Sequence, residues 1–416
     1  MNITGIIAEF NPLHKGHSYI LERARKDAGS DCVIVVMSGD FVQRGTPAVC
    51  GKHLRAKMAL MSGADIVIEL PVKAATSSAE FFASSGVFLL EATGVVTDMI
   101  FGVESNDRDA LSKISEVLAS EPESYKSNLK EELKKGHTFP TARQTALLHI
   151  LPKLHDLSII MSSPNNILAI EYLKALKRLD SKIKPHFVSR LGAGYHDNLI
   201  SPVTSSALAI RSALMERDEI EPVKSELPES AFAILSAEYK KTFPVFPPDI
   251  SSILKYRLIN AVYTKEDLTQ YAGVSKSLAD RIAKKATDFR DTDDLIQKLK
   301  TKDMTYTRIS RALLHILLGI NSPEETLDAS NSCIRILGFK ESATPVIKQM
   351  KEKSKVPVIS RPSDAKEVLS DKAMTVFNDT LKASDIYNKI VEEKYNAVLF
   401  DDLLRKAEKN DGICIC

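Results

Sequence analysis

The segment Gly5-Ile-Ile-Ala-Glu-Phe-Asn-Pro-Leu-His-Lys-Gly-His17, close to the start of the chain, decides the fold. Its apolar beginning predicts a β-strand over Thr4–Glu9, and helical periodicity follows over Ser18–Lys26. Two histidines and a glycine stand between the strand and the helix, in the pattern His-x-Gly-His. A strand, a loop and a helix in this order form the first unit of a parallel sheet with crossover helices.

The same alternation continues through the first hundred residues. Further strands are predicted at Cys32–Met37, Ile66–Leu70 and Met99–Phe101, and helices over His53–Ser62 and Ser78–Leu90. We therefore expect an α/β fold with a doubly wound parallel sheet. Such sheets bind ligands beyond the carboxyl ends of their strands. The unusual residues of this chain lie in the corresponding loops: Glu9–His17, Ser38–Lys52 and Gly102–Ser105.

Strand patterns become rarer later in the chain. Residues 106–151 are polar and helical, which is typical of a solvated face. A helix is expected over Ile167–Leu176 and a strand near His186–Ser189. Beyond about residue 220, helices are predicted over Asp249–Val262, Ser275–Ala286, Asp293–Lys300 and Tyr306–Leu318. We expect two domains, residues 1–220 and a mainly helical 221–416. Apolar stretches at Ile334–Leu337, Val356–Ile359 and Ala397–Leu399 predict either a small sheet edge or packed turns.

The composition is that of a globular protein. A length of 416 residues exceeds the usual size of a domain with one hydrophobic core. A composition of 44% hydrophobic and 26% charged residues excludes a disordered or fibrous chain. A net charge of +2 excludes an obligate nucleic-acid coat, although a local basic face is compatible with RNA. There is no signal-peptide pattern, and no apolar run approaches the roughly 20 residues that span a bilayer. The cytoplasm is the expected location.

Five scattered cysteines fit a reducing compartment, because their number is odd and they lack paired metal-ligand spacing. Two of them, Cys414 and Cys416, end the chain. We expect this tail to be frayed and its two thiols to be incidental, with chelation or cross-linking as the alternative.

The His14-Lys15-Gly16-His17 turn has the residue types that phosphate chemistry needs. Backbone N–H groups at a helix N-terminus favour phosphate, and Gly16 lets the backbone approach closely. Two imidazoles placed there can stabilise negative charge that accumulates on an α-phosphate while pyrophosphate departs. The alternative is a pair of surface histidines near a helix cap.

This turn resembles the H-x-G-H signature of the nucleotidylyl transferase superfamily, which includes the class I aminoacyl-tRNA synthetases. A KMSKS-like lysine loop is not evident, which speaks against a synthetase. Several segments in one order resemble, more narrowly, the tRNA(Met) cytidine acetate ligase family, strongly over the first two hundred residues and more loosely afterwards. They are GIIAEFNPLHKGH (5–17), MSGDFVQRGTPAV (37–49), KHLRAKMAL (52–60), ADIVIELP (64–71), FGVES (101–105), SPNNILAIEY (163–172), SRLGAGYHD (189–197) and TYTRISRALLHILLGI (305–320).

The resemblance implies two half-reactions. Acetate attacks the α-phosphate of ATP to give acetyl-adenylate and pyrophosphate, and the exocyclic amine of the wobble cytidine in elongator tRNA(Met) then takes the acetyl group. It implies a nucleotidylyl transferase-like catalytic domain followed by a helical tRNA-binding domain. The expected cofactor is ATP with Mg²⁺ held mainly by the nucleotide, and the expected partners are ATP, acetate and the tRNA, with no membrane and no protein partner. No dedicated metal ligands are expected in the protein.

The resemblance also implies the site residues. His14 and His17 are the expected catalytic residues. Nucleotide contacts are expected from Ile7, Ala8, Glu9, Phe10, Asn11, Pro12, Leu13, His14, Lys15, Gly16, His17, Ser18, Tyr19, Ile20, Gly102, Asn165, Asn166, Arg190 and Leu191. For the two asparagines, which one contacts the nucleotide stays open, and a helix cap is the alternative.

Further phosphate or tRNA contacts are expected from Lys52, Arg55, Ser205, Ser206, Arg211, Arg308 and Arg311. Gly51 departs from the family pattern, in which an acidic residue precedes the lysine. The serines and Arg211 suit a helix start that holds phosphates, or an ordinary N-cap. Arg308 and Arg311, with Lys300 and Lys302 before them, form a basic and aromatic cluster with Tyr306 on a helix and its entry, interrupted by Asp303-Met304. A plain helix surface is the alternative.

Two other functions remain open from the sequence. A nucleotidylyl transferase that acts on a small phosphorylated metabolite without RNA would use the same site. A nucleotide-sensing RNA-binding protein would keep the pocket without turnover, which the intact His14 and His17 disfavour.

Overall fold

A computed structural model describes residues 1–105, 107–154, 156–189, 206–321, 326–399, 401–404, 407–410 and 412–416. Five parallel strands form the centre of the fold, in the order β5-β2-β1-β6-β7. Their bounds are β1 (Ile3–Ala8), β2 (Cys32–Ser38), β5 (Ile66–Leu70), β6 (Asp98–Val103) and β7 (Lys184–Ser189). The predicted strands are confirmed. Because the chain crosses from β5 back over β1 to β6, the strand order reverses at the β1/β6 pair, where such sheets bind ligands.

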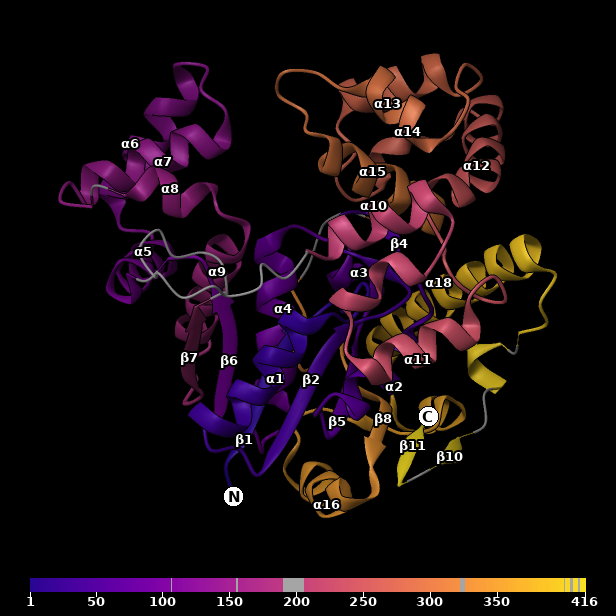
Figure 1. The fold of residues 1–416 in the computed structure, drawn as a ribbon. Coiled ribbons are helices and arrows are strands. Elements are labelled where there is room, and N and C mark those ends of the chain that lie inside the picture. The colour runs from indigo at the N-terminus through magenta and orange to yellow at the C-terminus, as the bar shows by residue number, and fades with distance from the viewer. Residues whose placement is uncertain are drawn as a thin grey trace.

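Helices cover both faces of this sheet (Figure 1). The alternation along β2 explains why, since Ile34 and Val36 pack into one core while Val33 and Val35 pack into the other. The first core contains α4 (Ala79–Ala92), α5 (Arg108–Ser120) and α9 (Pro164–Arg178), and the second contains α1 (Lys15–Asp27) and α2 (Lys52–Met61). The doubly wound architecture is confirmed.

The C-terminal part of the chain returns to the same sheet. The strand β8 (Ile334–Lys340) pairs antiparallel with β5, β11 (Ile413–Ile415) pairs with β8, and β10 (Glu408–Asn410) completes this edge. The short β9 (Val358–Ile359) pairs with β8, whereas Ala397–Leu399 forms no strand. Residues beyond 334 therefore extend the same sheet.

The end of the chain is ordered by this pairing, so the expectation of a frayed tail is wrong. Cys414 and Cys416 are only 3% and 6% exposed and pack into the core. All five cysteines are buried thiols.

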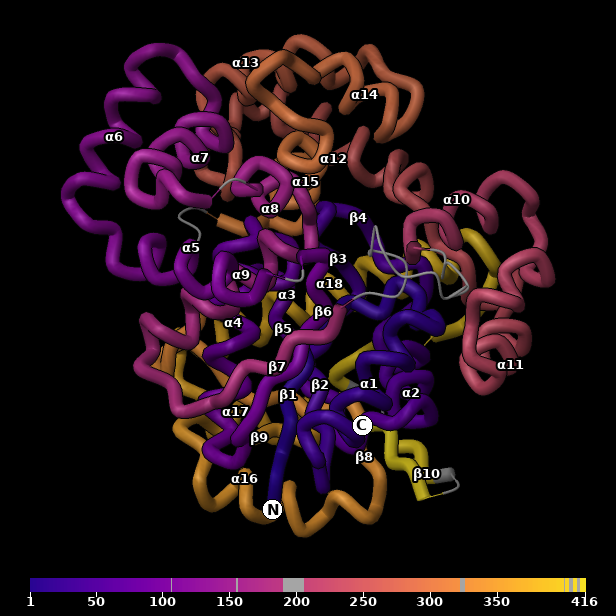
Figure 2. The backbone as a smooth tube through the Cα atoms, turned by 60° about the vertical axis from the view of Figure 1, so that its left-hand side comes forward, coloured from indigo at the N-terminus to yellow at the C-terminus, as the bar shows by residue number. Residues whose placement is uncertain are grey.

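The remaining helices form layers around the sheet. They are α3 (Val72–Ala75), α6 (Glu123–Lys134), α7 (Phe139–Ile150), α8 (Leu157–Ser162), α10 (Ala207–Arg217), α11 (Glu229–Glu238), α12 (Ser251–Tyr263), α13 (Lys276–Lys285), α14 (Thr292–Leu299), α15 (Tyr306–Leu318), α16 (Thr344–Lys353), α17 (Ala365–Val368) and α18 (Asp371–Tyr395). The group α12–α15 has a hydrophobic core of its own. Figures 1 and 2 place this group and α6–α8 beyond the same end of the sheet, opposite the N-terminus.

In the part of the chain that the structure describes, no helix combines the length and the apolar character that a membrane span requires.

Candidate functional site

A pocket of about 420 Å³ lies at the carboxyl ends of β1 and β6. Residues from stretches far apart in the sequence line it, which places most of the predicted site in one cavity. They include Ile7, Ala8, Glu9, Phe10, Asn11, His14, Gly16, His17, Tyr19, Ile20, Gln43, Arg44, Phe101, Gly102, Glu104, Asn165, Tyr172, Ser206 and Arg211. The strand-order reversal therefore coincides with the cavity, as expected for a doubly wound sheet.

The two histidines of the His-x-Gly-His turn cap helix α1. His14 is the N-cap residue, and its Nδ1 accepts a hydrogen bond from the Gly16 N–H at 3.1 Å. His17 Nδ1 accepts from the His14 N–H at 3.3 Å, and the two rings stack with their centroids 3.8 Å apart. Because each Nδ1 is an acceptor, each neutral ring carries its hydrogen on Nε2. The turn therefore supplies two imidazole N–H donors at a helix N-terminus, where anions are favoured.

The backbone before the turn is fixed by its neighbours. Phe10 adopts a left-handed conformation with φ 48°, and its buried ring packs edge-on against His17 at 5.0 Å. Asn11 Oδ1 accepts from the Val49 N–H at 2.7 Å. A left-handed φ is costly for a bulky residue and persists only where the surroundings hold it.

Arg55 holds the loops after β1 and β2 together instead of facing the pocket. Its guanidinium donates to the carbonyl oxygens of Glu9 at 2.9 Å and Ser38 at 2.8 Å, and also to Cys50 at 2.9 Å and to Gly39. The side chain is fully buried. The prediction of a phosphate or tRNA contact for Arg55 is therefore wrong, since its donors are committed to backbone carbonyls.

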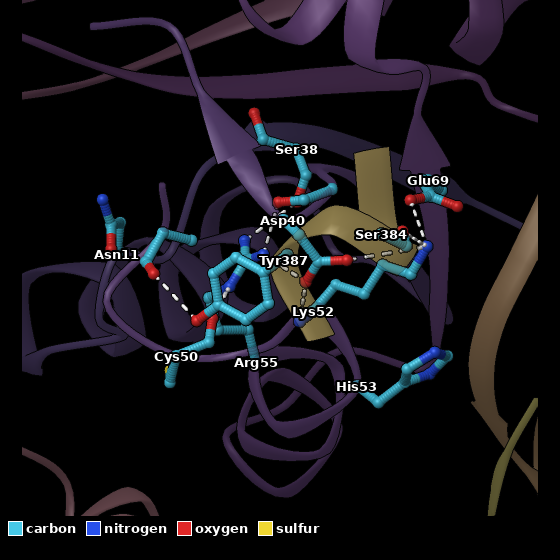
Figure 3. Close-up of polar contacts among 12 residues, drawn as sticks. Asn11, Ser38, Asp40, Cys50, Lys52, His53, Arg55, Glu69, Ser384 and Tyr387 are labelled. Atoms are coloured by element: carbon cyan, nitrogen blue, oxygen red, sulfur yellow. Dashed lines mark hydrogen bonds and ion pairs between the residues drawn. The ribbon is translucent and has the colours of Figure 1, made fainter. Parts of the chain in front are cut away.

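Lys52 lies in a buried cluster of charges (Figure 3). Its Nζ contacts Glu69 Oε1 at 2.7 Å, Ser384 Oγ at 2.7 Å and Asp402 Oδ2 at 2.6 Å, and only 1% of the side chain is exposed. Arg335 Nη1 lies 2.8 Å from each of the two carboxylates. The prediction of a phosphate or tRNA contact for Lys52 is also wrong, because acidic partners far away in the sequence neutralise it inside the protein.

The electrostatics of this cluster favour the charged forms. Burial alone would oppose ionisation of Asp402, but Lys52 and Arg335 outweigh it and hold the pKa of that carboxyl well below its usual range. Burial likewise opposes the charge on Arg335, and Glu69 and Asp402 raise its pKa above the usual value. The acidic residue that is missing at Gly51 has a spatial substitute, since Asp40 Oδ1 accepts the Lys52 N–H at 2.7 Å at the start of α2.

The two asparagines have different positions. Asn166 is buried, and its Oδ1 accepts the N–H groups of Glu104 at 2.9 Å and Ser105 at 3.0 Å. Asn165 lines the pocket, and its Nδ2 donates to Glu104 Oε1 at 2.5 Å. The Glu104 carboxylate also accepts the Asn165 N–H at 3.2 Å at the N-terminus of α9. Asn166 therefore fixes the loop after β6, while Asn165 and Gly102 face the cavity.

On the opposite wall, Ser206 is the N-cap of α10 and accepts the Ala209 N–H at 3.2 Å. Arg211, on the same helix, donates to the Asn11 carbonyl and lines the pocket. Burial lowers the Arg211 pKa, Glu9 opposes this shift and Arg44 adds to it. Arg190, Leu191 and Ser205 lie outside the described residues.

Arg308 and Arg311 lie on α15 and are not among the residues that line the pocket, although the Arg311 backbone packs against Gly45, next to the lining residue Arg44. Arg308 is exposed in the first turn, while Arg311 is half-buried. Tyr306 donates to Asp293 Oδ1 within the helical group. Their role toward RNA stays a prediction.

The sequence interpretation missed several residues of the cavity. Phe101 and Tyr172 form an aromatic wall with ring centroids 5.4 Å apart, and Gln43 and Arg44 enter from the loop after β2. Arg44 lies in the segment 37–49, in the loop that follows the strand predicted at Cys32–Met37. An arginine in such a loop was a usable signal of a phosphate contact. Among the described residues, no three His, Cys, Asp or Glu side chains gather in a way that could hold a metal ion.

Comparisons with known proteins agree with this geometry. A family model described as HIGH Nucleotidyl Transferase matches residues 1–400. The tRNA(Met) cytidine acetate ligase of Caldanaerobacter subterraneus subsp. tengcongensis is 40% identical over 389 residues, which is 93% of this chain and 95% of the relative. That of Acetivibrio thermocellus is 39% identical over 88% of this chain and 89% of its own length.

A solved structure of Thermotoga maritima TmcAL bound with alpha-thio ATP is similar with a TM-score of 0.87 and 32% sequence identity, covering 97% of this chain and 98% of the other. A ligand-free form of the same protein gives a TM-score of 0.87 at 33% identity, with the same coverage. The chain therefore belongs to the HIGH nucleotidyl transferase family and, within it, to the tRNA(Met) cytidine acetate ligases.

Proposed function

We propose that this chain is an ATP-dependent ligase that acetylates the exocyclic amine of the wobble cytidine in elongator tRNA(Met), giving N4-acetylcytidine. It activates acetate as acetyl-adenylate and releases pyrophosphate, and AMP leaves after the transfer. The observation that carries this proposal is the pair of His14 and His17 at the N-terminus of α1, in a pocket at the strand-order reversal. Family membership and the T. maritima structure with alpha-thio ATP support the choice of nucleotide.

In the first half-reaction, a carboxylate oxygen of acetate forms a bond to the α-phosphorus. The bond from that phosphorus to the bridging oxygen breaks, and its electron pair leaves with pyrophosphate. Acetate is already an anion, so no base has to remove a proton from it. The Nε2–H groups of His14 and His17 then stabilise the charge on the phosphoryl oxygens in the transition state.

The remaining contacts follow from the walls of the pocket. We place the nucleoside against Gly102 and Asn165, where a missing Cβ and an amide permit close approach and hydrogen bonding. Ser206 and Arg211 lie on the α10 wall, which suits the phosphates. Arg190, Leu191 and Ser205 remain proposals that rest on the family resemblance alone. Mg²⁺ would accompany ATP, held mainly by the phosphate oxygens, which are the hard ligands that it prefers.

In the second half-reaction, the cytidine amine forms a bond to the acetyl carbonyl carbon, the bond from that carbon to the phosphate oxygen breaks and AMP departs with its electron pair, and the nitrogen releases one proton to solvent. We assign tRNA binding to the helical part of residues 221–416, with Arg308 and Arg311 as contacts to backbone phosphates. The ATP-binding catalytic unit is assigned to residues 1–220, completed by the strands that return after residue 334.

Incubation with ATP, labelled acetate and total tRNA, followed by nucleoside analysis, tests the proposal. The expected product is labelled N4-acetylcytidine in elongator tRNA(Met), and it should disappear when ATP is omitted. Label confined to the protein would contradict the proposal. Nucleotidyl transfer to a small phosphorylated metabolite without RNA would instead establish the alternative function.

A further inference from the structure

The hairpin formed by β3 (Phe41–Val42) and β4 (Thr46–Pro47) carries a cation that the proposed mechanism has not used. Its tip consists of Gln43, Arg44 and Gly45. The Gly45 N–H donates to the Val42 carbonyl at 2.9 Å, and Gly45 has φ +75°. Such a loop, closed by a residue in the left-handed conformation, is a common and well-defined hairpin connection. The backbone on both sides of Arg44 is therefore specified by local geometry.

Contacts with two other parts of the molecule fix the tip in space. On one side, the Gln43 N–H donates to Glu9 Oε1 at 2.8 Å, which ties the tip to the loop that leads into the His-x-Gly-His turn. On the other side, Ser310 Oγ of α15 donates to the Gly45 carbonyl at 2.8 Å. A Cβ at Gly45 would lie 2.4 Å from the Arg311 backbone nitrogen, so the tip and α15 pack backbone against backbone.

The base of the hairpin is anchored as well. Phe41 is fully buried and meets the Tyr387 ring edge-on, with centroids 6.1 Å apart. The Tyr387 hydroxyl donates to the Ala48 carbonyl at 2.9 Å. Since tip and base are both held, the exposed Arg44 side chain extends from a rigid support into the pocket lining.

The arginine side chains at this end of the pocket favour the binding of a polyanion. Arg44 and Arg211 both line the cavity, and each lies within electrostatic range of the other. The Glu9 carboxylate acts on Arg211 and raises its pKa, and one of its oxygens accepts the Gln43 N–H. Arg44 and Arg211 therefore stand beside Glu9, while the second carboxylate of the lining, Glu104, accepts hydrogen bonds from Asn165 at the N-terminus of α9, and the two like charges of the arginines repel each other. An anion with several oxygens relieves this repulsion, and guanidinium groups bind such oxygens in pairs.

We propose that Arg44 is a catalytic residue that binds the β- and γ-phosphates of ATP and the departing pyrophosphate, at a position set by the contact of the β3–β4 tip with α15. The identity of the attacking acid rests on the proposed function, whereas the contact between Arg44 and the polyphosphate does not. The Arg44 guanidinium donates hydrogen bonds that stabilise the electron pair that the bridging oxygen takes from the α-phosphorus, and the step transfers no proton.

Calorimetric titration of the full chain with a non-hydrolysable ATP analogue and with AMP tests this assignment. Arg44→Ala should weaken binding of the analogue by about tenfold or more and leave AMP binding within about twofold, because AMP lacks the β- and γ-phosphates. Arg44→Lys should recover part of the loss, since it keeps the charge without the fork. Lys26→Ala, which removes a cation that is 65% exposed in the last turn of α1, is the matched control and should change neither affinity.

Equal losses for the analogue and AMP, or no loss for either, would overturn the assignment. The role of the hairpin is tested with Ser310→Ala and Gly45→Ala, which should weaken the analogue more than AMP in protein whose unfolding transition is retained. Unchanged analogue binding in both variants would contradict the coupling to α15. If the unaltered protein shows no acetate-dependent pyrophosphate exchange, the proposed function fails, while the comparison of analogue with AMP still decides the role of Arg44.

Discussion

Replacement of Arg55 by Met is the sharpest test of how the loops around the site are held. The variant keeps an apolar stem of similar length but removes every donor from a fully buried position. Four carbonyl oxygens, those of Glu9, Ser38, Gly39 and Cys50, lose their charged partner. A buried group left without a hydrogen bond costs roughly 1–3 kcal/mol. Even at the lower end, the free energy of unfolding should fall by about 4 kcal/mol, a large part of the usual 5–15 kcal/mol.

Urea unfolding followed by circular dichroism measures this loss. Arg290→Met is the matched control, because the Arg290 side chain is 84% exposed and its removal should change the unfolding free energy by less than about 0.5 kcal/mol. Arg55→Lys keeps the charge with fewer donors in a different geometry and should lose about half as much stability. Arg55→Lys also provides a second measurement in case Arg55→Met does not fold.

The same pair of variants separates a structural role from a phosphate contact. A structural clamp predicts reduced stability in Arg55→Lys, with ATP and AMP affinities altered in parallel in the folded protein. A loss of at most about 1 kcal/mol in Arg55→Met would refute the clamp. Normal stability of Arg55→Lys with selective loss of ATP affinity would restore the phosphate contact expected from the sequence.

Three further predictions concern Lys52, the two asparagines and His315. Lys52→Met should lower the free energy of unfolding by roughly 3–5 kcal/mol, because the buried carboxylates of Glu69 and Asp402 are left with Arg335 as their cation. A urea denaturation midpoint equal to that of the unaltered protein would contradict this. Asn165→Ala should weaken AMP binding with little change in stability. Asn166→Ala should instead lower the free energy of unfolding by about 2 kcal/mol, since the N–H groups of Glu104 and Ser105 lose their acceptor. Calorimetry and urea unfolding on both variants measure these effects, and the reversed pattern would contradict the assignment. Burial lowers the pKa of His315 from 6.5 to about 4. The stability that neutral His315 contributes is therefore present above pH 6.5 and is lost as the pH falls toward 4, a total of about 3 kcal/mol. His315→Gln should remove this part of the dependence of the unfolding free energy on pH, and an unchanged dependence would contradict the prediction.

The parallel sheet and its ligand edge could be predicted because they depend on local patterns. Short apolar runs alternate with helical periodicity, and the loops after β1, β2 and β6 follow from chain order alone. The capping turn of His14 and His17 is equally local, since its hydrogen bonds span two or three residues. Such features are encoded within a few residues of the chain.

The errors concern contacts between distant parts of the sequence. The local sequence around Lys52 shows only a cation near a glycine-containing loop. Its actual partners are Glu69, Ser384 and Asp402, which lie up to 350 residues away in the sequence. The pairing of β8 with β5 is likewise non-local, so an apolar run near residue 335 gave no sign that it joins the first sheet. Arg44 was overlooked for the same reason, since its importance depends on the hairpin meeting both Glu9 and α15.

The most direct test of the central claim is acetate-dependent exchange of labelled pyrophosphate into ATP in the absence of tRNA. The mechanism predicts that the unaltered protein exchanges label only when acetate is present. His17→Ala should reduce the rate on the order of 100-fold, because a donor to the charge that develops in the transition state is lost. Absence of exchange with acetate across a range of magnesium concentrations, or an undiminished rate in His17→Ala, would contradict it.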